Sequence, residues 1–273
     1  MTTKEFTQSL VKNLYLGQFI VFEGIDGSGK STQAKLLCDT IEEKGIPVLH
    51  TQEPTKVSIF GNLVRFLYTH AGQEVVIAQK IIEFFNGEAF WEYYRFAEGE
   101  QKQLHNMFQV IASELTSHDF ANLHLFIQLC MIFDREDHRT RTEIPALEKG
   151  THVISDRDYL STLAYGSSGG IDWKELLKMQ LGYIGYNFIA PNVIFLLDIP
   201  VEIGLTRTLK KQEGKKEFFD DHERLLKIQD TYYAVIAHNI VLEHSKVFVI
   251  DGNKAEDVVR QEIWKIAEPL FTT

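Results

Sequence analysis

The chain has 273 residues, of which 44% are hydrophobic and 24% are charged, and its formal net charge at pH 7 is −10. This length allows a full hydrophobic core, and the composition is typical of a globular protein. The negative charge argues against binding to a nucleic-acid backbone, although a local basic site could still hold a phosphorylated small molecule. The sequence starts without a secretory signal pattern and has no apolar run long enough to cross a bilayer. We therefore expect a cytoplasmic protein without nucleic-acid or membrane partners.

The two cysteines, Cys38 and Cys130, each lie within an apolar stretch of helical spacing. We expect both to be small core residues and not a disulfide or a metal-binding pair. Such usage is consistent with a reducing compartment.

A glycine-rich turn follows the first predicted strand. Residues 18–23 form an apolar run typical of a buried strand, and the run ends in Gly24-x-x-x-x-Gly29-Lys30-Ser31, after which residues up to about 44 have helical spacing. This order is the context of a phosphate-binding loop, although a chance match in a glycine-rich turn is the alternative. We expect Lys30 to reach the β- and γ-phosphates and Ser31 to bind Mg²⁺, while backbone N–H groups and the helix N-terminus hold phosphate oxygens. The predicted phosphate-binding residues are Gly24, Gly27, Ser28, Gly29, Lys30, Ser31 and Thr32.

Four further apolar strands alternate with predicted helices. The predicted strands are residues 47–51, 151–156, 191–198 and 247–251, and the predicted helices include 61–68, 125–147 and a segment after residue 158 that is interrupted at 166–170. Strands that are apolar on both faces and separated by helices indicate an α/β protein, with a three-layer α/β/α arrangement around a five-stranded parallel sheet.

The predicted domain organisation is an N-terminal extension over residues 1–16 and one domain over 17–273. Residues 69–122 are rich in aromatic and glutamate residues and have helical spacing in places. We interpret them as an inserted helical region rather than a linker, because disordered segments are poor in aromatic residues.

Charged residues follow the second and third predicted strands. Gln52-Glu53-Pro54 comes after one strand and Asp156-Arg157 after the other. Ligands of such sheets bind at the carboxyl ends of the strands. Asp156 is placed to help hold Mg²⁺, and an arginine beside it can neutralise charge during phosphoryl transfer between two nucleotides. A simple surface ion pair is the alternative for Asp156-Arg157.

The ordered set of motifs resembles the thymidylate kinase family, a group of P-loop nucleoside monophosphate kinases. The motifs are residues 19–33, Thr51-Gln52-Glu53-Pro54, Asp134-Arg135, Ser155-Asp156-Arg157, Ala164-Tyr165-Gly166, residues 204–207 and Val249-Ile250-Asp251. The resemblance covers about residues 17–271, apart from 69–122. It implies transfer of the γ-phosphoryl group of Mg-ATP to dTMP, which gives dTDP, and it implies a homodimer.

The resemblance also implies roles for single residues. Lys30, Asp26 and Arg157 are the implied catalytic residues, and Ser31 and Asp156 the implied Mg²⁺ ligands. A lid over about residues 207–219 is expected to close over ATP with Arg207, Lys210 and Lys211. The implied acceptor-binding residues are Glu53, Pro54, Lys56, Arg65, Met131, Arg135, Arg157, Ser161, Thr162 and Tyr165. Within that set, Arg135 matches the arginine that hydrogen-bonds the thymine edge, Ser161 and Thr162 fall where the base is read from its other edge, and Tyr165 matches the tyrosine that packs under the deoxyribose.

The sequence departs from the family pattern at Met131, Gln52 and Asp158. Met131 replaces an aromatic residue that stacks on thymine, and Gln52 replaces an arginine whose charge Lys56 could supply. Asp158 replaces an aromatic residue and adds a negative charge near a phosphate site. At Gly27, where some members have an arginine, the sequence is instead similar to the bacterial-type arrangement, in which basic lid residues supply that charge. These departures leave open a kinase of another deoxynucleotide or of a nucleoside, or a nucleotide-binding regulatory protein with a kinase-like fold.

Overall fold

The computed structural model describes residues 11–70, 80–81, 83, 120–211, 221–238 and 244–271. Most of the expected insertion at 69–122 and much of the expected lid at 207–219 lie outside these residues. Five strands form one parallel sheet in the order β3-β4-β2-β6-β7, which confirms the predicted fold class. They are β2 (Phe19–Glu23), β3 (Val48–Gln52), β4 (His152–Asp156), β6 (Val193–Asp198) and β7 (Lys246–Asp251).

The central strand β2 contributes side chains to both faces of the sheet. Phe19 and Val21 belong to one hydrophobic core, and Ile20 and Phe22 belong to the other. Successive side chains of a strand point to opposite faces, so an apolar run without alternation fits a strand that is covered on both sides.

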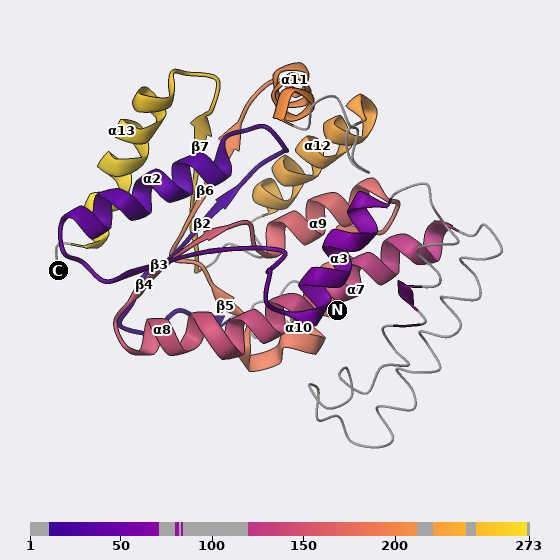
Figure 1. The fold of residues 1–273 in the computed structure, drawn as a ribbon, viewed down its shortest axis with the longest axis horizontal. Coiled ribbons are helices and arrows are strands. Elements are labelled where there is room, and N and C mark those ends of the chain that lie inside the picture. The colour runs from indigo at the N-terminus through magenta and orange to yellow at the C-terminus, as the bar shows by residue number, and fades with distance from the viewer. Residues whose placement is uncertain are drawn as a thin grey trace.

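Helices form the two outer layers. On one face of the sheet, α2 (Lys30–Glu43) and α13 (Glu256–Ala267) lie together, as Figure 1 shows. The other face carries α9 (Tyr159–Ser168), α10 (Trp173–Ile184) and α12 (His222–His238). Further elements are α8 (Ile144–Glu148), α11 (Val201–Lys211) and the 3₁₀ turns Gly185–Asn187 and Glu268–Leu270.

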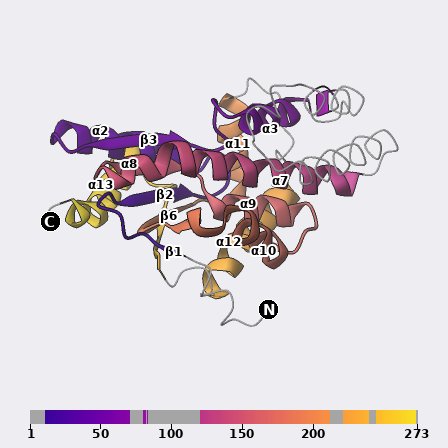
Figure 2. The ribbon, with the colours of Figure 1, turned by 90° about the horizontal axis from the view of Figure 1, so that it is seen from below.

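A third hydrophobic cluster joins α3 (Ile59–Thr69) to α7 (Phe120–His138), which lie side by side in Figures 1 and 2. The Ser58 hydroxyl oxygen starts α3 by accepting hydrogen bonds from the N–H groups of Phe60 (3.1 Å) and Gly61 (3.2 Å). A Cβ at Gly61 would collide with the Thr55 carbonyl oxygen, so this glycine lets α3 approach the preceding loop. The helix pair forms one wall of the cavity described below.

Local structure differs from the sequence-based expectations at two places. The single helix expected over 125–147 is α7 followed by a π-helical turn at Arg139–Glu143 and then α8. Part of the expected N-terminal extension also joins the fold, because β1 (Val11–Lys12) pairs in parallel with β5 (Ile189–Ala190). Two-residue strands show no periodicity, so pattern analysis does not detect them.

Both cysteines are buried and free, as expected. Within the described ranges, no helix combines the length and the apolarity that a membrane crossing requires.

Candidate active site

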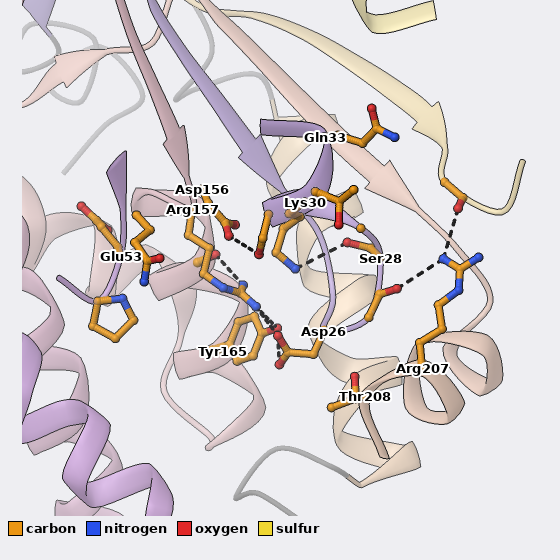
Figure 3. A pocket seen from close by; sticks show the side chains of 18 of the residues that line it. Asp26, Ser28, Lys30, Gln33, Glu53, Asp156, Arg157, Tyr165, Arg207 and Thr208 are labelled. Atoms are coloured by element: carbon orange, nitrogen blue, oxygen red, sulfur yellow. Dashed lines mark hydrogen bonds and ion pairs between the residues drawn. The ribbon is translucent and has the colours of Figure 1, made fainter. Parts of the chain in front are cut away.

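A cavity of about 940 Å³ opens at the carboxyl ends of the strands. It runs from the glycine-rich loop, past Asp156 and Arg157, to a wall formed by residues of α3, α7 and α9. Figure 3 shows the central part of this cavity. The size and shape allow two ligands to meet at the middle, where the charged side chains gather.

The loop between β2 and α2 has the geometry of an anion-binding nest. Gly29 caps α2 with a φ of 96°, and Gly27 has a φ of 77°. A Cβ at Gly27 would collide with the carbonyl oxygen of Gly204 on α11, so this packing has no room for a side chain at position 27. The absence of an arginine from the loop therefore has a structural cause.

Lys30 lies inside this loop and is only 5% exposed. Its Nζ donates to the carbonyl oxygen of Ile25 (2.7 Å) and lies 3.4 Å from Ser28 Oγ. Burial and the nearby Arg157 guanidinium lower the pKa of Lys30 to about 8. A phosphate at the loop would be a better partner for this ammonium than a carbonyl oxygen.

Arg157 is the centre of the charged group in the middle of the cavity. Its guanidinium pairs with Asp26 and donates to the hydroxyls of Tyr165 (3.0 Å) and Ser161 (3.0 Å). Tyr165 in turn donates to Asp26 Oδ2 (2.9 Å), so the three labelled side chains point toward one another in Figure 3. Although burial raises the pKa of Asp26, Arg157 and Lys30 lower it below its ordinary value. Arg157 thus pairs with the loop carboxylate of Asp26 and not with its neighbour Asp156.

The backbone of Arg157 has a φ of 77°, which is uncommon for a residue with a Cβ. The N–H of Arg157 donates to the Phe22 carbonyl oxygen (2.9 Å), and its own carbonyl oxygen accepts from Ser155 Oγ (2.8 Å). Such strain persists where the surroundings fix the backbone, and it aims this guanidinium at the phosphate loop.

Glu23 at the end of β2 anchors the start of α9. This fully buried carboxylate accepts from the N–H of Asp158 (2.9 Å), from Ser161 Oγ (2.6 Å) and from Tyr232 OH (2.9 Å). Burial raises the pKa of Glu23 to about 7, against the lowering effect of the Ser161 hydrogen bond and of Arg157. Because Ser161 also binds Arg157, Glu23 positions the arginine through that serine.

Ser31 and Asp156 meet across the cavity, where the serine hydroxyl donates to Asp156 Oδ2. The other oxygen, Asp156 Oδ1, is buried and has no hydrogen-bond partner within the described part of the chain. A hydroxyl beside an unpartnered carboxylate oxygen at a phosphate loop fits a Mg²⁺ ion, which takes one or two protein oxygens and completes its shell with water and phosphate.

Most of the expected acceptor-binding residues do line the far end of the cavity. These are Glu53, Pro54, Arg65, Met131, Arg157, Ser161, Thr162 and Tyr165. Arg65 donates to the carbonyl oxygens of Pro54 and Thr55, which fixes it beside the loop after β3. Lys56 is exposed and is not among the lining residues, so Arg65 and Arg157 supply the positive charge here.

Arg135 does not lie where the expected contact with the base would place it. It is fully buried, and it is not among the residues that line the cavity. Its guanidinium donates to Glu53 (Nε–Oε2, 3.0 Å), to Thr162 Oγ1 (3.1 Å) and to Gln180, and it also pairs with Asp158 at 3.0 Å. The carboxylates of Glu53 and Asp158 hold the guanidinium away from the opening.

Asp158 is not directed at the phosphate site either. It is 1% exposed and accepts two hydrogen bonds from Arg139, at 2.8 and 2.7 Å. The negative charge that the sequence adds after Arg157 is therefore neutralised inside the protein. An ion pair between residues 19 positions apart in the chain is not visible as a local motif.

His138 belongs to the same buried cluster of charged side chains as Arg135 and Asp158. Burial lowers the pKa of His138, but Glu143 and Glu53 raise it, and the result is about 9. Its Nδ1 lies 3.7 Å from Glu143 and 3.8 Å from Glu53, while Thr51 binds its other ring nitrogen.

We expect His138 to make stability depend on pH above neutrality. Since the folded pKa of about 9 exceeds the ordinary value of 6.5, its contribution is complete below pH 6.5 and is lost as the pH rises through 9. The shift corresponds to roughly 3 kcal/mol. Denaturant unfolding of the wild type and of His138→Asn, measured from pH 6 to 9.5, checks this prediction. The contributions of other titrating groups cancel in the difference between the two unfolding free energies. A difference that stays constant over this range would contradict the prediction.

The opposite end of the cavity holds Arg207, which donates to the carbonyl oxygens of Gly27 (3.3 Å) and Gly252 (3.2 Å). Lys210 is exposed and is not among the lining residues, and the side chain of Lys211 lies outside the described part of the structure.

Sequence reasoning missed several lining residues at both ends. They are Gln33, Tyr68, Thr69, Gln128, Thr208, Gly252, Lys254, Glu256 and Val259. Two signals could have found some of them. Gly252, Lys254 and Glu256 follow the carboxyl end of β7, and Gln128 lies three residues before Met131 on one helix face.

A parallel sheet with a phosphate loop at its carboxyl edge, and with a charged cavity beside it, defines a P-loop nucleotide-binding protein. The model of the family described as "Thymidylate kinase" matches residues 22–113 and 76–263 of this chain. The chain therefore belongs to the thymidylate kinase family.

Curated relatives agree with this family. A "Probable thymidylate kinase" of Thermococcus kodakarensis is 33% identical over 214 residues, which cover 78% of this chain and 82% of the relative. The "Probable thymidylate kinase" of Pyrococcus abyssi is 35% identical over 215 residues, with 78% of each chain covered. The "Thymidylate kinase" of Leptospira interrogans is 29% identical over 248 residues, which cover 91% of this chain and 92% of the relative.

Proposed function

We propose that this chain is a thymidylate kinase, an enzyme that transfers the γ-phosphoryl group of ATP to dTMP and releases dTDP and ADP. The observation that carries the proposal is one continuous cavity that joins a phosphate loop, through Arg157, to the residues of the acceptor end. The family and the names of the curated relatives give the same reaction.

The reaction needs positioning and charge neutralisation more than proton transfer. An oxygen of the dTMP phosphate attacks the γ-phosphorus, a new P–O bond forms, and the bond to the β–γ bridging oxygen breaks with its electron pair on ADP. The acceptor oxygen is already anionic, so no strong general base is required. Lys30 and Arg157 would stabilise the charge that develops on the oxygens of the transferred group.

Asp26 and Tyr165 would hold Arg157 in place between the two nucleotides, because both bind its guanidinium. Ser31 and Asp156 would hold Mg²⁺, which would supply positive charge to offset that of the phosphates. At the donor end, Arg207 would lie next to ATP, and Lys210 and Lys211 would approach only if the lid closes. A homodimer and a cytoplasmic location remain predictions from the sequence.

The acceptor panel tests this function. Purified protein with Mg-ATP should release ADP with a strong preference for dTMP over dCMP, dGMP, UMP, AMP and thymidine, with dUMP accepted less well. Lys30→Ala is the matched negative control, because it removes the loop ammonium and should lower turnover by about 10²-fold or more. Release of ADP with another acceptor in preference to dTMP would reassign the substrate. ATP binding without transfer to any acceptor would contradict the proposed function.

A further inference from the structure

Gln128 is a buried polar residue whose amide groups are not used by any residue that the structure describes. It lies on α7, it is 1% exposed, and it lines the acceptor end of the cavity. Neither Oε1 nor Nε2 has a hydrogen-bond partner within the residues that the structure describes. A buried amide without partners is costly, so its presence at a cavity wall calls for a ligand that supplies the missing partners.

Packing against α9 restricts the position of the Gln128 side chain. A Cβ placed on Gly166 would come within 3.0 Å of Gln128 Cγ and 3.2 Å of its Cδ, so the side chain lies directly across this glycine of α9. Thr162 lies one turn earlier on α9, and Met131 lies one turn later on α7. All three of Gln128, Met131 and Thr162 line the cavity, so the Gln128 side chain is part of the pocket wall.

Thr162 gives this wall a second, directed group. Its Oγ1 accepts a hydrogen bond from Arg135 (3.1 Å), and Arg135 can only donate. The hydroxyl proton of Thr162 then remains for a ligand, since the structure shows no acceptor for it among the described residues. Arg135 therefore orients Thr162 from behind the wall, and an oxygen acceptor in the cavity suits the hydroxyl better than an amino group.

We propose that Gln128 is a specificity-determining contact for the acceptor base. The inference rests on the proposed function and identifies how its site recognises the base. The amide has one donor and one acceptor side by side, and the edge of thymine has a 4-keto oxygen beside an N3–H. Nε2–H donates to the keto oxygen and Oε1 accepts from N3–H. Thr162 donates to the same keto oxygen, so the 4-amino group of cytosine is disfavoured at that position.

The test compares two acceptors in two proteins. One acceptor is dTMP, and the other is the deoxynucleotide of 5-methylpyrimidin-2-one, which lacks both the 4-keto oxygen and the N3 proton. Gln128→Met keeps the length and most of the packing of the side chain but removes the amide. We expect kcat/KM for dTMP to fall about tenfold to a hundredfold, and kcat/KM for the analogue to change less than about threefold. Leu129→Met, on the same helix but inside the cluster with α3, is the control and should leave both values unchanged.

The outcomes separate this inference from the proposed function. Equal losses for both acceptors would mean that Gln128 is only structural, and they would overturn the inference while the function stands. A wild-type protein that does not phosphorylate dTMP would overturn both. If Gln128→Met does not fold, Gln128→Glu provides the test. It removes the donor, so the preference for dTMP over dCMP should fall at least tenfold, and an unchanged preference would overturn the inference.

Discussion

Replacing Arg157 by alanine should lower the rate of phosphoryl transfer by about 10³-fold while the protein stays folded. The guanidinium lies between the phosphate loop and the acceptor end, and it binds Asp26, Tyr165 and Ser161. Its pKa is raised well above the ordinary value, although burial alone would lower it, because Tyr165 and Asp26 favour the charged form. It is therefore a fixed positive charge where the transferred group must pass. Since Asp26 is 34% exposed, water can solvate it in the variant, and we expect only a small loss of stability.

Single-turnover rates with saturating Mg-ATP and dTMP would measure this effect apart from product release. Arg157→Lys should stay close to the alanine variant, because an ammonium cannot reproduce the fork that binds three partners. Arg260→Ala is the control, since this arginine contacts Thr40 and does not line the cavity. A rate for Arg157→Ala within tenfold of the wild type would contradict the assigned role.

Replacing Arg135 by methionine should cost about 3–5 kcal/mol of unfolding free energy, because it leaves buried carboxylates without their partner. Arg135 is fully buried between Glu53 and Asp158, whose side chains are each 1% exposed. For a chain of this size, the loss corresponds to a fall in Tm of roughly 10 °C. Lys35→Ala removes an ion pair in which the two side chains are 65% and 42% exposed, and it should change stability by less than about 0.5 kcal/mol.

The cost of Arg135→Met should also depend on pH. Against the effect of burial, Arg135 and His138 lower the pKa of Glu53 to about 2. In the wild type the contribution of Glu53 is thus present above pH 4.5 and is lost only as the pH falls through about 2. Without Arg135, the buried carboxylate can take up a proton at mildly acidic pH, so the deficit should be largest near pH 7 and smaller near pH 5. Denaturant unfolding at both values measures this. A deficit below 1 kcal/mol at pH 7 would show that the pair contributes no more than a surface ion pair.

Burial of whole strands is the part of the fold that the sequence predicted well. The apolar run within residues 191–198 favours a strand covered on both faces, and β6 is such a strand. The π-helical turn at Arg139–Glu143 was not predictable in this way. It contains Arg139, which pairs with Asp158 from outside this helix. The helical periodicity of the sequence does not reveal that pairing.

The residues of the candidate site also fall into a part that the sequence predicted and a part that it did not. The positions of Lys30, Ser31, Asp26 and Arg157 follow from strand–loop–helix order, because the carboxyl ends of parallel strands meet at one edge of the sheet. These residues form the centre of the cavity. The residues expected to read the acceptor base come from helices, whose side chains point in directions that depend on how the helices pack.

The sequence by itself determined that this chain folds as a P-loop α/β protein and that Lys30, Ser31, Asp26 and Arg157 gather at the phosphate loop, because both follow from the order of strands, loops and helices along the chain. Only the tertiary structure decided which residues of the acceptor wall face the cavity. Arg135 and Gln128 lie on the same helix face, seven residues apart, and both are polar. The buried carboxylates of Glu53, just after β3, and Asp158, just before α9, hold Arg135 away from the cavity. Gly166 leaves room for Gln128 at the wall. Residues distant in sequence therefore determine which side chain faces the cavity. Arg135 turns toward Glu53 and Asp158 because opposite charges attract strongly inside a protein.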